Sequence, residues 1–112
     1  MQAKAVARYI RMSPRKARRV LQMIRGLPVK QAQSLLTVLP HSAARAVRRV
    51  VDSAAANAEN NHGMDKDGLW IEQAYADEGP TLDRWRFASG GRIGRIHKRI
   101  SHISVVVSDE ER

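Results

Sequence analysis

The chain has 112 residues, a formal net charge of +9 and a sequence pI of about 11.1. This length suits one domain with a modest core, and the charge favours a nucleic acid or an anionic surface as partner. Cysteine is absent, which excludes disulfides, thiol catalysis and the usual zinc sites. No apolar run approaches the roughly 18 residues of a membrane span, and bases interrupt the N-terminal apolar runs, so we expect no signal peptide and a cytoplasmic protein.

The charges are segregated along the chain. Residues 1–51 contain twelve Lys or Arg and no acid, residues 52–83 contain eight acids and one base, and residues 84–108 contain six bases and no acid. Two basic blocks around an acidic one indicate that particular faces of the protein meet phosphate.

The first half of the chain predicts a strand followed by three helices. Alternation over 2–11 predicts a strand with one shared face, made by Ala3, Ala5, Ala7 and Tyr9. Ser13 and Pro14 are typical of a helix start, and Gly26 of its end. A second helix is expected at about 29–38. A third runs from Ser42 to about Asn61, where small residues permit close packing.

The second half predicts strands. Residues 69–77 predict a strand with a common face of Leu69, Ile71, Gln73 and Tyr75, and a last strand has an apolar face of Ile103, Val105 and Val107. The expected fold class is α+β, with three helices packed on a small antiparallel sheet. Two of its strands would run on into a long protruding β-hairpin. We expect one domain over 1–112, with a globular body of 1–77 and 102–112 and a hairpin arm of 78–101.

The arm is the most informative segment. From Arg84 to Ser104 it contains six bases, two histidines, three glycines and no acid, and only four branched aliphatic residues. Isolated two-stranded ribbons are marginally stable in water. We therefore expect a polyanion, RNA or DNA, to order the arm.

Each basic cluster also has a plainer interpretation. The bases of the first helix could form a solvated face, and those of the arm could discourage edge-to-edge aggregation. Phosphate contact is favoured because residues 1–51 supply no acid for i,i+4 pairing. For Arg45, Arg48 and Arg49 both interpretations stay open, and Trp85 and Phe87 could either stack on unpaired bases or pack across the hairpin.

Catalysis and metal binding have little support. The four histidines lack accompanying carboxylates, and Asp65 and Asp67 resemble the start of a calcium loop without its downstream ligands. No nucleophile–base arrangement or phosphate-cradling glycine loop stands out. We predict no catalytic residues, no metal site, no cofactor and no enzyme.

Four segments closely resemble the bacterial large-subunit ribosomal protein number 22 family. They are SPRKARRVLQMIRG at 13–26, SAAANAENN at 53–61, YADEGPTLDR at 75–84 and KRISHISVVVSD at 98–109. The resemblance implies a structural, rRNA-binding constituent of the large ribosomal subunit that supports its assembly. It implies a body on the subunit surface and a hairpin whose tip lines the exit tunnel of the nascent polypeptide. The implied partners are 23S-type rRNA, neighbouring ribosomal proteins and the nascent chain at the tip, with no membrane and no stable homo-oligomer.

Two residue sets follow from the basic clusters and the resemblance together. The predicted rRNA-binding set is Arg8, Arg11, Ser13, Arg15, Lys16, Arg18, Arg19, Arg25, Arg84, Arg86, Arg92, Arg95, His97, Lys98, Arg99, Ser101 and His102. The predicted tunnel-lining tip is Trp85, Arg86, Phe87, Ala88, Ser89, Gly90, Gly91, Arg92 and Ile93.

The tip departs from the family pattern. The run FASGGRI at 87–93 stands where the family usually has Pro-Arg-Ala-Lys/Arg-Gly-Arg-Ala, so we expect a less positive tip. The alternative function is a DNA-architectural protein with a basic β-arm in the minor groove. That interpretation explains the charge equally well, but it usually needs a dimer and a clear apolar wedge at the tip.

Overall fold

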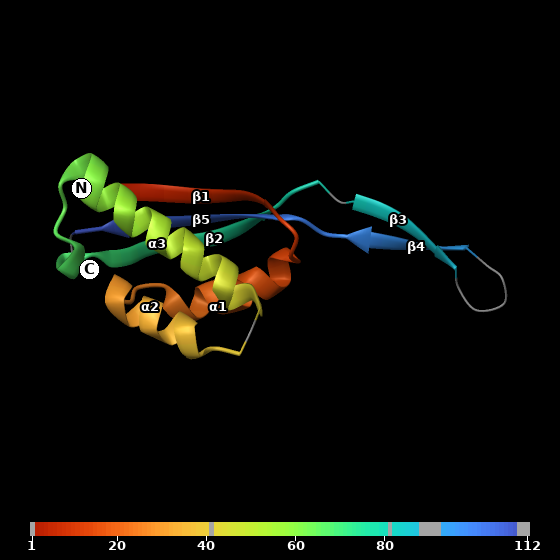
Figure 1. The fold of residues 1–112 in the computed structure, drawn as a ribbon, viewed down its shortest axis with the longest axis horizontal. Helices are drawn as coiled ribbons and strands as arrows, with labels where there is room; N and C mark the ends of the chain where they lie inside the picture. Colours follow the sequence, from red (N-terminus) through yellow and green to blue (C-terminus); the bar gives the residue numbers. More distant parts are fainter. Residues whose placement is uncertain (1, 41, 81, 88–92, 110–112) are drawn as a thin grey trace.

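The computed structural model describes residues 2–40, 42–80, 82–87 and 93–109, with the backbone alone described for 82–87 and 93–98. A strand, three helices and a short 3-10 turn are followed by four strands (Figure 1). Their bounds are β1 Gln2–Ile10, α1 Pro14–Ile24, α2 Val29–Val38, α3 Ser42–His62, η1 Lys66–Gly68, β2 Trp70–Glu78, β3 Leu82–Phe87, β4 Ile93–Lys98 and β5 Ser101–Ser108. The expected α+β class is confirmed.

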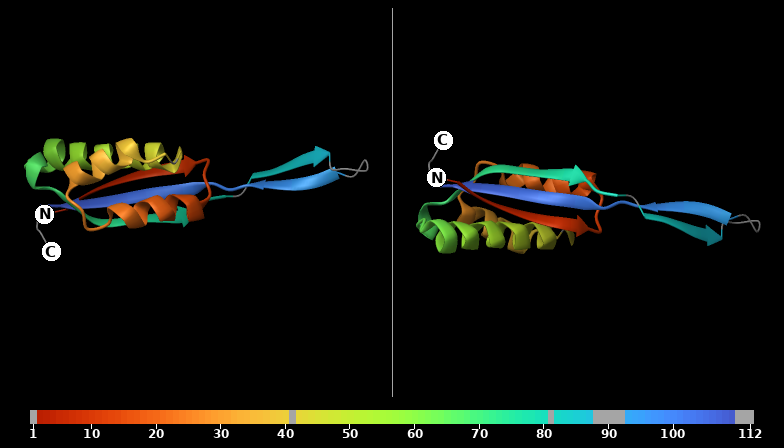
Figure 2. Two further views of the ribbon diagram at one scale, coloured as in Figure 1. Left: turned by 90° about the horizontal axis from the view of Figure 1, so that it is seen from below. Right: turned by 90° about the horizontal axis from the view of Figure 1, so that it is seen from above.

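The body is built on a three-stranded antiparallel sheet in the order β1-β5-β2. The helices cover one face of this sheet, and the other face is open (Figure 2, right). On the covered face, α3 packs along β1 and β5, α1 lies against β2, and α2 lies against α3. Both edge strands pair with the last strand of the body, so the two ends of the chain meet in one sheet.

Small and branched aliphatic side chains form the core between sheet and helices. The predicted inward positions of α3 are all buried, and Ala44 joins them; they are Ala43, Val47, Val50, Val51, Ala54, Ala55 and Ala58. Ile103, Val105 and Val107 on β5 are fully buried beneath the helices, as predicted. Alanine at four α3 positions lets this helix approach the sheet closely, because a methyl group leaves room for the backbone.

The start and end of α1 follow local chemistry. Pro14 occupies the first turn, where its missing N–H costs nothing, and the Ser13 carbonyl accepts hydrogen bonds from the N–H groups of Lys16 and Ala17. The Ser13 side chain makes no capping hydrogen bond. Gly26 follows the helix with φ +77°, a left-handed conformation that glycine adopts without strain.

The predicted face of β2 is wrong. Ile71 is buried as expected, but the inward residues after it are Ala74 and Ala76, whereas Gln73 is exposed and Tyr75 is half-buried. The cause is a register shift between Ile71 and Gln73, where β2 pairs with β5. One extra residue at such a bulge exchanges the two faces of the strand beyond it.

The predicted face of β1 fails in the same way at its end. Ala3 and Ala5 are buried, but Tyr9 is 65% exposed. The pairing with β5 shifts between Ala7 and Ile10, and Tyr9 adopts φ 59°. A left-handed residue turns the strand, so the Tyr9 ring leaves the core face.

The arm is a separate two-stranded sheet of β3 and β4, which pair from Leu82 with Lys98 to Phe87 with Ile93. The predicted protruding β-hairpin is therefore present, as a sheet separate from that of the body. The junction includes Gly79 and Pro80, and the Gly79 N–H donates to the Ile100 carbonyl. The arm extends from the body along the longest dimension of a molecule that measures 60 × 25 × 20 Å (Figure 1).

Candidate nucleic-acid interface

Helix α1 presents a basic face to solvent. Its core side is buried through Ala17, Val20, Leu21 and Ile24. The predicted phosphate ligands Arg15, Lys16, Arg18 and Arg19 are exposed on this helix. Within the described ranges, no carboxylate forms an ion pair with any of these four side chains. The helix therefore carries uncompensated positive charge where a polyanion could reach it.

Two of the predicted arginines also have a structural task. The Arg18 guanidinium donates to the Ala76 carbonyl oxygen through Nε at 3.1 Å and Nη2 at 2.9 Å, and Arg25 Nε donates to the Ala74 oxygen at 2.7 Å. Both carbonyls lie on β2, an edge strand of the body sheet. The two side chains therefore tie α1 to this edge. A guanidinium has five N–H donors, so each arginine keeps others for a phosphate.

Helix α3 adds a second basic group. Arg45, Arg48 and Arg49 are exposed on its first three turns. A hollow of about 270 Å³ separates this end of α3 from α1, and Lys16 and Arg19 line its other side. The packing of α1 and α3 on one sheet face thus brings two basic clusters together that lie far apart in the sequence.

Where the arm joins the body, some of the predicted rRNA-binding residues are exposed and one is buried. Arg8, Arg11 and Arg99 are exposed, and Arg99 lies 3.7 Å from the Glu78 carboxylate in a solvent-exposed pair. Ser101 is fully buried, and its hydroxyl donates to the Met12 carbonyl oxygen. A buried hydroxyl with a backbone partner is out of reach of RNA, so Ser101 joins β5 to the segment after β1 instead.

His102 is half-buried at the same junction. Its Nδ1 accepts a hydrogen bond of 3.1 Å from the Tyr9 backbone N–H, and the two rings meet edge to face at 5.0 Å. Gly79 lies against it, since a Cβ there would be 3.1 Å from His102 Nε2 and 3.0 Å from the Ile100 side chain. His102 therefore helps to fix the place where the arm leaves the body.

Basic residues lie along both paired strands of the arm. Arg84 and Arg86 lie on β3, opposite Ile96 and Gly94. On β4, Arg95 lies opposite Trp85, His97 opposite Asp83, and Lys98 opposite Leu82. Of the predicted tip, Trp85, Arg86, Phe87 and Ile93 lie within these strands, whereas 88–92, including Arg92, lie outside the described residues.

The acidic residues are arranged elsewhere. Lys30 and Asp67 form an exposed ion pair, and the hydrogen bond and charge of Asp67 raise the pKa of Lys30. The side chain of Asp65 accepts a hydrogen bond from the Asp67 N–H, as in an ordinary turn. Among the described residues, no group of three or more His, Asp or Glu side chains could hold a metal ion. In that same part of the chain, no helix is long and apolar enough to cross a membrane.

Sequence reasoning missed two features of this surface. The edge-strand role of Arg18 and Arg25 has no signal in the sequence, because it depends on α1 lying against β2. The proximity of α1 to the start of α3 likewise follows from packing. The one available signal was the complete absence of acids before Asp52, which covers both helices and the segment between them.

Comparison with known proteins identifies the family. The family model for ribosomal protein L22p/L17e matches residues 5–108. The large ribosomal subunit protein uL22 of Halothermothrix orenii is 48% identical over 111 residues, covering 99% of this chain and 98% of that protein. The uL22 proteins of Desulforamulus reducens and Pelotomaculum thermopropionicum are 51% and 52% identical over the same shares. The chain, with its helix-covered sheet and basic hairpin arm, belongs to the ribosomal protein L22p/L17e family.

Proposed function

We propose that this protein is a structural constituent of the large ribosomal subunit that is held there by large-subunit rRNA. The bases of α1 and of the arm bind phosphates, and the hairpin tip lines the exit tunnel and meets the nascent polypeptide. The protein acts in the cytoplasm, next to other large-subunit proteins, as a monomer without catalytic activity. Its part in the subunit is to support assembly and to shape the tunnel wall.

The observation that carries this proposal is the positive charge of α1 together with the bases of the arm. Arg15, Lys16 and Arg19 on α1 are exposed and have no acidic partner among the described residues. The arm adds bases on both strands of a ribbon that projects from the body. The body would place the basic residues of α1 on the surface of an RNA, while the arm would reach between its helices. This combination suits a folded RNA better than a straight duplex.

The proposal predicts a steep salt dependence of rRNA binding. If about six arm bases each neutralise one phosphate, the slope of log affinity against log salt is roughly −4 to −5 from the arm alone. The measurement is equilibrium binding of the whole chain to purified large-subunit rRNA over a salt series. Replacing Arg15, Lys16 and Arg19 by Gln should make the slope shallower by roughly two units.

The control is Lys30→Gln, which removes one base that is already paired with Asp67. That variant should bind with nearly the wild-type slope. A flat salt dependence of the wild-type chain would contradict the proposal. Equal affinity for large-subunit rRNA and for duplex DNA of unrelated sequence would favour the DNA-architectural alternative.

A further inference from the structure

We propose that a hollow between α2 and the first turns of α3 receives one unpaired nucleotide of the large-subunit rRNA. The base enters the hollow, and its phosphate lies at Arg45 and Arg48. This inference rests on the proposed rRNA binding and adds a site that the α1 and arm residues do not include.

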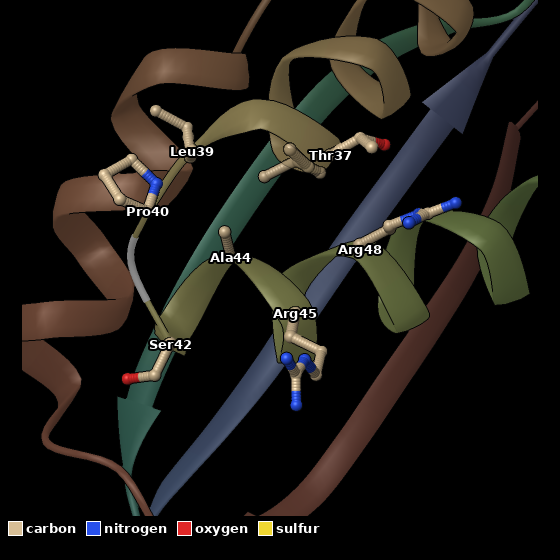
Figure 3. A pocket seen from close by; sticks show the side chains of 8 residues that line it. Thr37, Leu39, Pro40, Ser42, Ala44, Arg45 and Arg48 are labelled. Atoms are coloured by element: carbon tan, nitrogen blue, oxygen red, sulfur yellow. The ribbon is translucent and has the colours of Figure 1, made fainter.

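The hollow has an apolar wall and a volume of about 570 Å³. Its apolar lining comes from the end of α2, the following connection and the start of α3, through Leu36, Leu39, Pro40 and Ala44. Figure 3 shows Thr37 on the α2 side, Leu39 and Pro40 at the connection, and Ala44 with the two arginines on α3.

Size and lining suit a nucleobase. Small-molecule sites commonly measure about 300–1,000 Å³ and combine mostly apolar walls with a few polar groups. Here the polar groups are the hydroxyls of Thr37 and Ser42. The Thr37 hydroxyl donates to the Gln33 carbonyl at 2.8 Å, so its oxygen keeps lone pairs that can accept from an amino group of a base.

The charge at the rim favours an anionic occupant. Arg45 and Arg48 are exposed, and within the described ranges no carboxylate pairs with Arg45. The Arg48 Nε lies 4.0 Å from Asp52, in a pair whose two side chains are each 49% exposed. Exposed pairs of this kind contribute little, so the Arg48 guanidinium can exchange its partner for a phosphate. A nucleotide supplies both the flat apolar part and the negative charge, and arginine can stack on a base as well as bind its phosphate.

A neighbouring hollow favours a strand of RNA over a free nucleotide. The smaller hollow between α1 and α3 shares Pro40 and Ser42 with the larger one, and Lys16 and Arg19 line it. An RNA strand that leaves the larger hollow therefore next meets the side chains of Lys16 and Arg19. Consecutive phosphates of an RNA strand could contact Arg45 and Arg48 at one hollow and Lys16 and Arg19 at the other. A single small molecule could not reach both pairs.

The test fills the hollow without changing its charge. Thr37→Phe places a ring into the space from α2, whereas Ser34→Phe places the same ring on α2 outside the hollow. The two positions are matched, because both are exposed and both hydroxyls donate to the carbonyl four residues earlier. Arg45→Gln combined with Arg48→Gln tests the rim, and its control is Lys30→Gln, which removes a base of α2 that pairs with Asp67 and does not line the hollow. Binding to purified large-subunit rRNA is measured together with chemical probing of its unpaired bases, after circular dichroism has shown that each variant is folded.

Wild-type protein should shield one unpaired base that becomes reactive with Thr37→Phe, and this variant should bind about tenfold more weakly. Ser34→Phe and Lys30→Gln should leave that base shielded. Wild-type affinity and protection in Thr37→Phe, alongside weaker binding in the rim variant, would overturn the inference, since Arg45 and Arg48 would then contact phosphates with no inserted base. Failure of the wild-type chain to bind rRNA at all would overturn the proposed function first, so the two failures are distinguishable.

Discussion

The backbone of Tyr9 adopts a left-handed conformation that is unfavourable for most residues. Tyr9 is the only non-glycine residue with positive φ in the described part of the chain, and it lies beside His102, where the pairing of β1 with β5 shifts. The left-handed conformation costs an ordinary L-residue roughly 1–2 kcal/mol, and a β-branched residue tolerates it worst. The bend is therefore kept by its surroundings, which include the hydrogen bond to His102.

This strain predicts a difference between two substitutions that both remove the ring. Tyr9→Asn should be more stable than Tyr9→Val by about 1 kcal/mol, since asparagine tolerates φ near 60°. Urea denaturation of the two variants measures the difference. Equal unfolding free energies would mean that the turn at Tyr9 relaxes at no cost.

Tyr75 makes a second prediction at this scale. Lys4 lies on the open face of the sheet with Nζ 5.7 Å from the Tyr75 ring centroid, and hydrogen bonds to Lys4 and then to Ser104 lower the pKa of the Tyr75 phenol. Because the folded-state pKa is below the ordinary value, the fold favours the phenolate. This contribution is fully present above the ordinary value near 10 and is lost as the pH falls through the lowered pKa.

The measurement is an alkaline titration by ultraviolet absorbance in a Tyr9→Phe background, where Tyr75 is the remaining tyrosine. The folded chain should ionise at lower pH than the urea-unfolded chain, and Lys4→Met should remove most of that difference. Identical titrations with Lys4 and with Met at position 4 would contradict the assigned cause.

At the scale of elements, two arginines donate hydrogen bonds to backbone carbonyls on an edge strand of the body sheet. Edge strands carry free backbone groups that invite pairing with other chains. On β2, Arg18 and Arg25 occupy the Ala76 and Ala74 carbonyls, and the Ile71 carbonyl accepts from the Gly26 N–H. The same helix thus protects the sheet and presents bases to RNA.

This double role predicts that two arginine substitutions in and just after α1 have different effects on stability and on RNA binding. Arg25→Met keeps the side-chain stem but removes the bond to Ala74, and it should lower the free energy of unfolding by about 1 kcal/mol. Arg15→Met, on the same helix and with no such bond, should leave stability within about 0.5 kcal/mol but weaken rRNA binding. Chemical denaturation and rRNA binding are measured on both variants. An equally stable Arg25→Met would show that this carbonyl is satisfied by water alone.

The sequence was informative about elements wherever a local cause sets them. Ser13-Pro14 and Gly26 delimit α1, and the spacing of Val47, Val50, Val51 and Ala54 defines the buried side of α3. It failed at the two bulges, because whether a strand takes an extra residue depends on its neighbour β5.

At the scale of the whole molecule, the charge blocks of the sequence partly mix in space, because Lys30, Arg48 and Arg99 each pair with an acid. The exposed bases of α1 have no such partner among the described residues. The basic blocks were visible from composition alone, which was enough to predict an anionic partner. Which bases share a surface was not visible, because α1 and α3 come together only in the folded body, where they pack against each other beside the hollow at Pro40. The burial of Ser101 likewise depends on Met12, which is 89 residues away in the sequence.

The central claim is that the chain is embedded in the large ribosomal subunit by many charge contacts along a projecting arm. The most direct measurement is sedimentation of cell lysate through a gradient at about 0.5 M salt, where exposed charge contacts are largely screened, with fractions probed for this chain. We expect the wild-type chain to migrate with the large subunit. A variant with Gln at Arg84, Arg86, Arg95 and Lys98 should leave the subunit at lower salt. Release of the wild-type chain into the light fractions, or its recovery with DNA, would contradict the account.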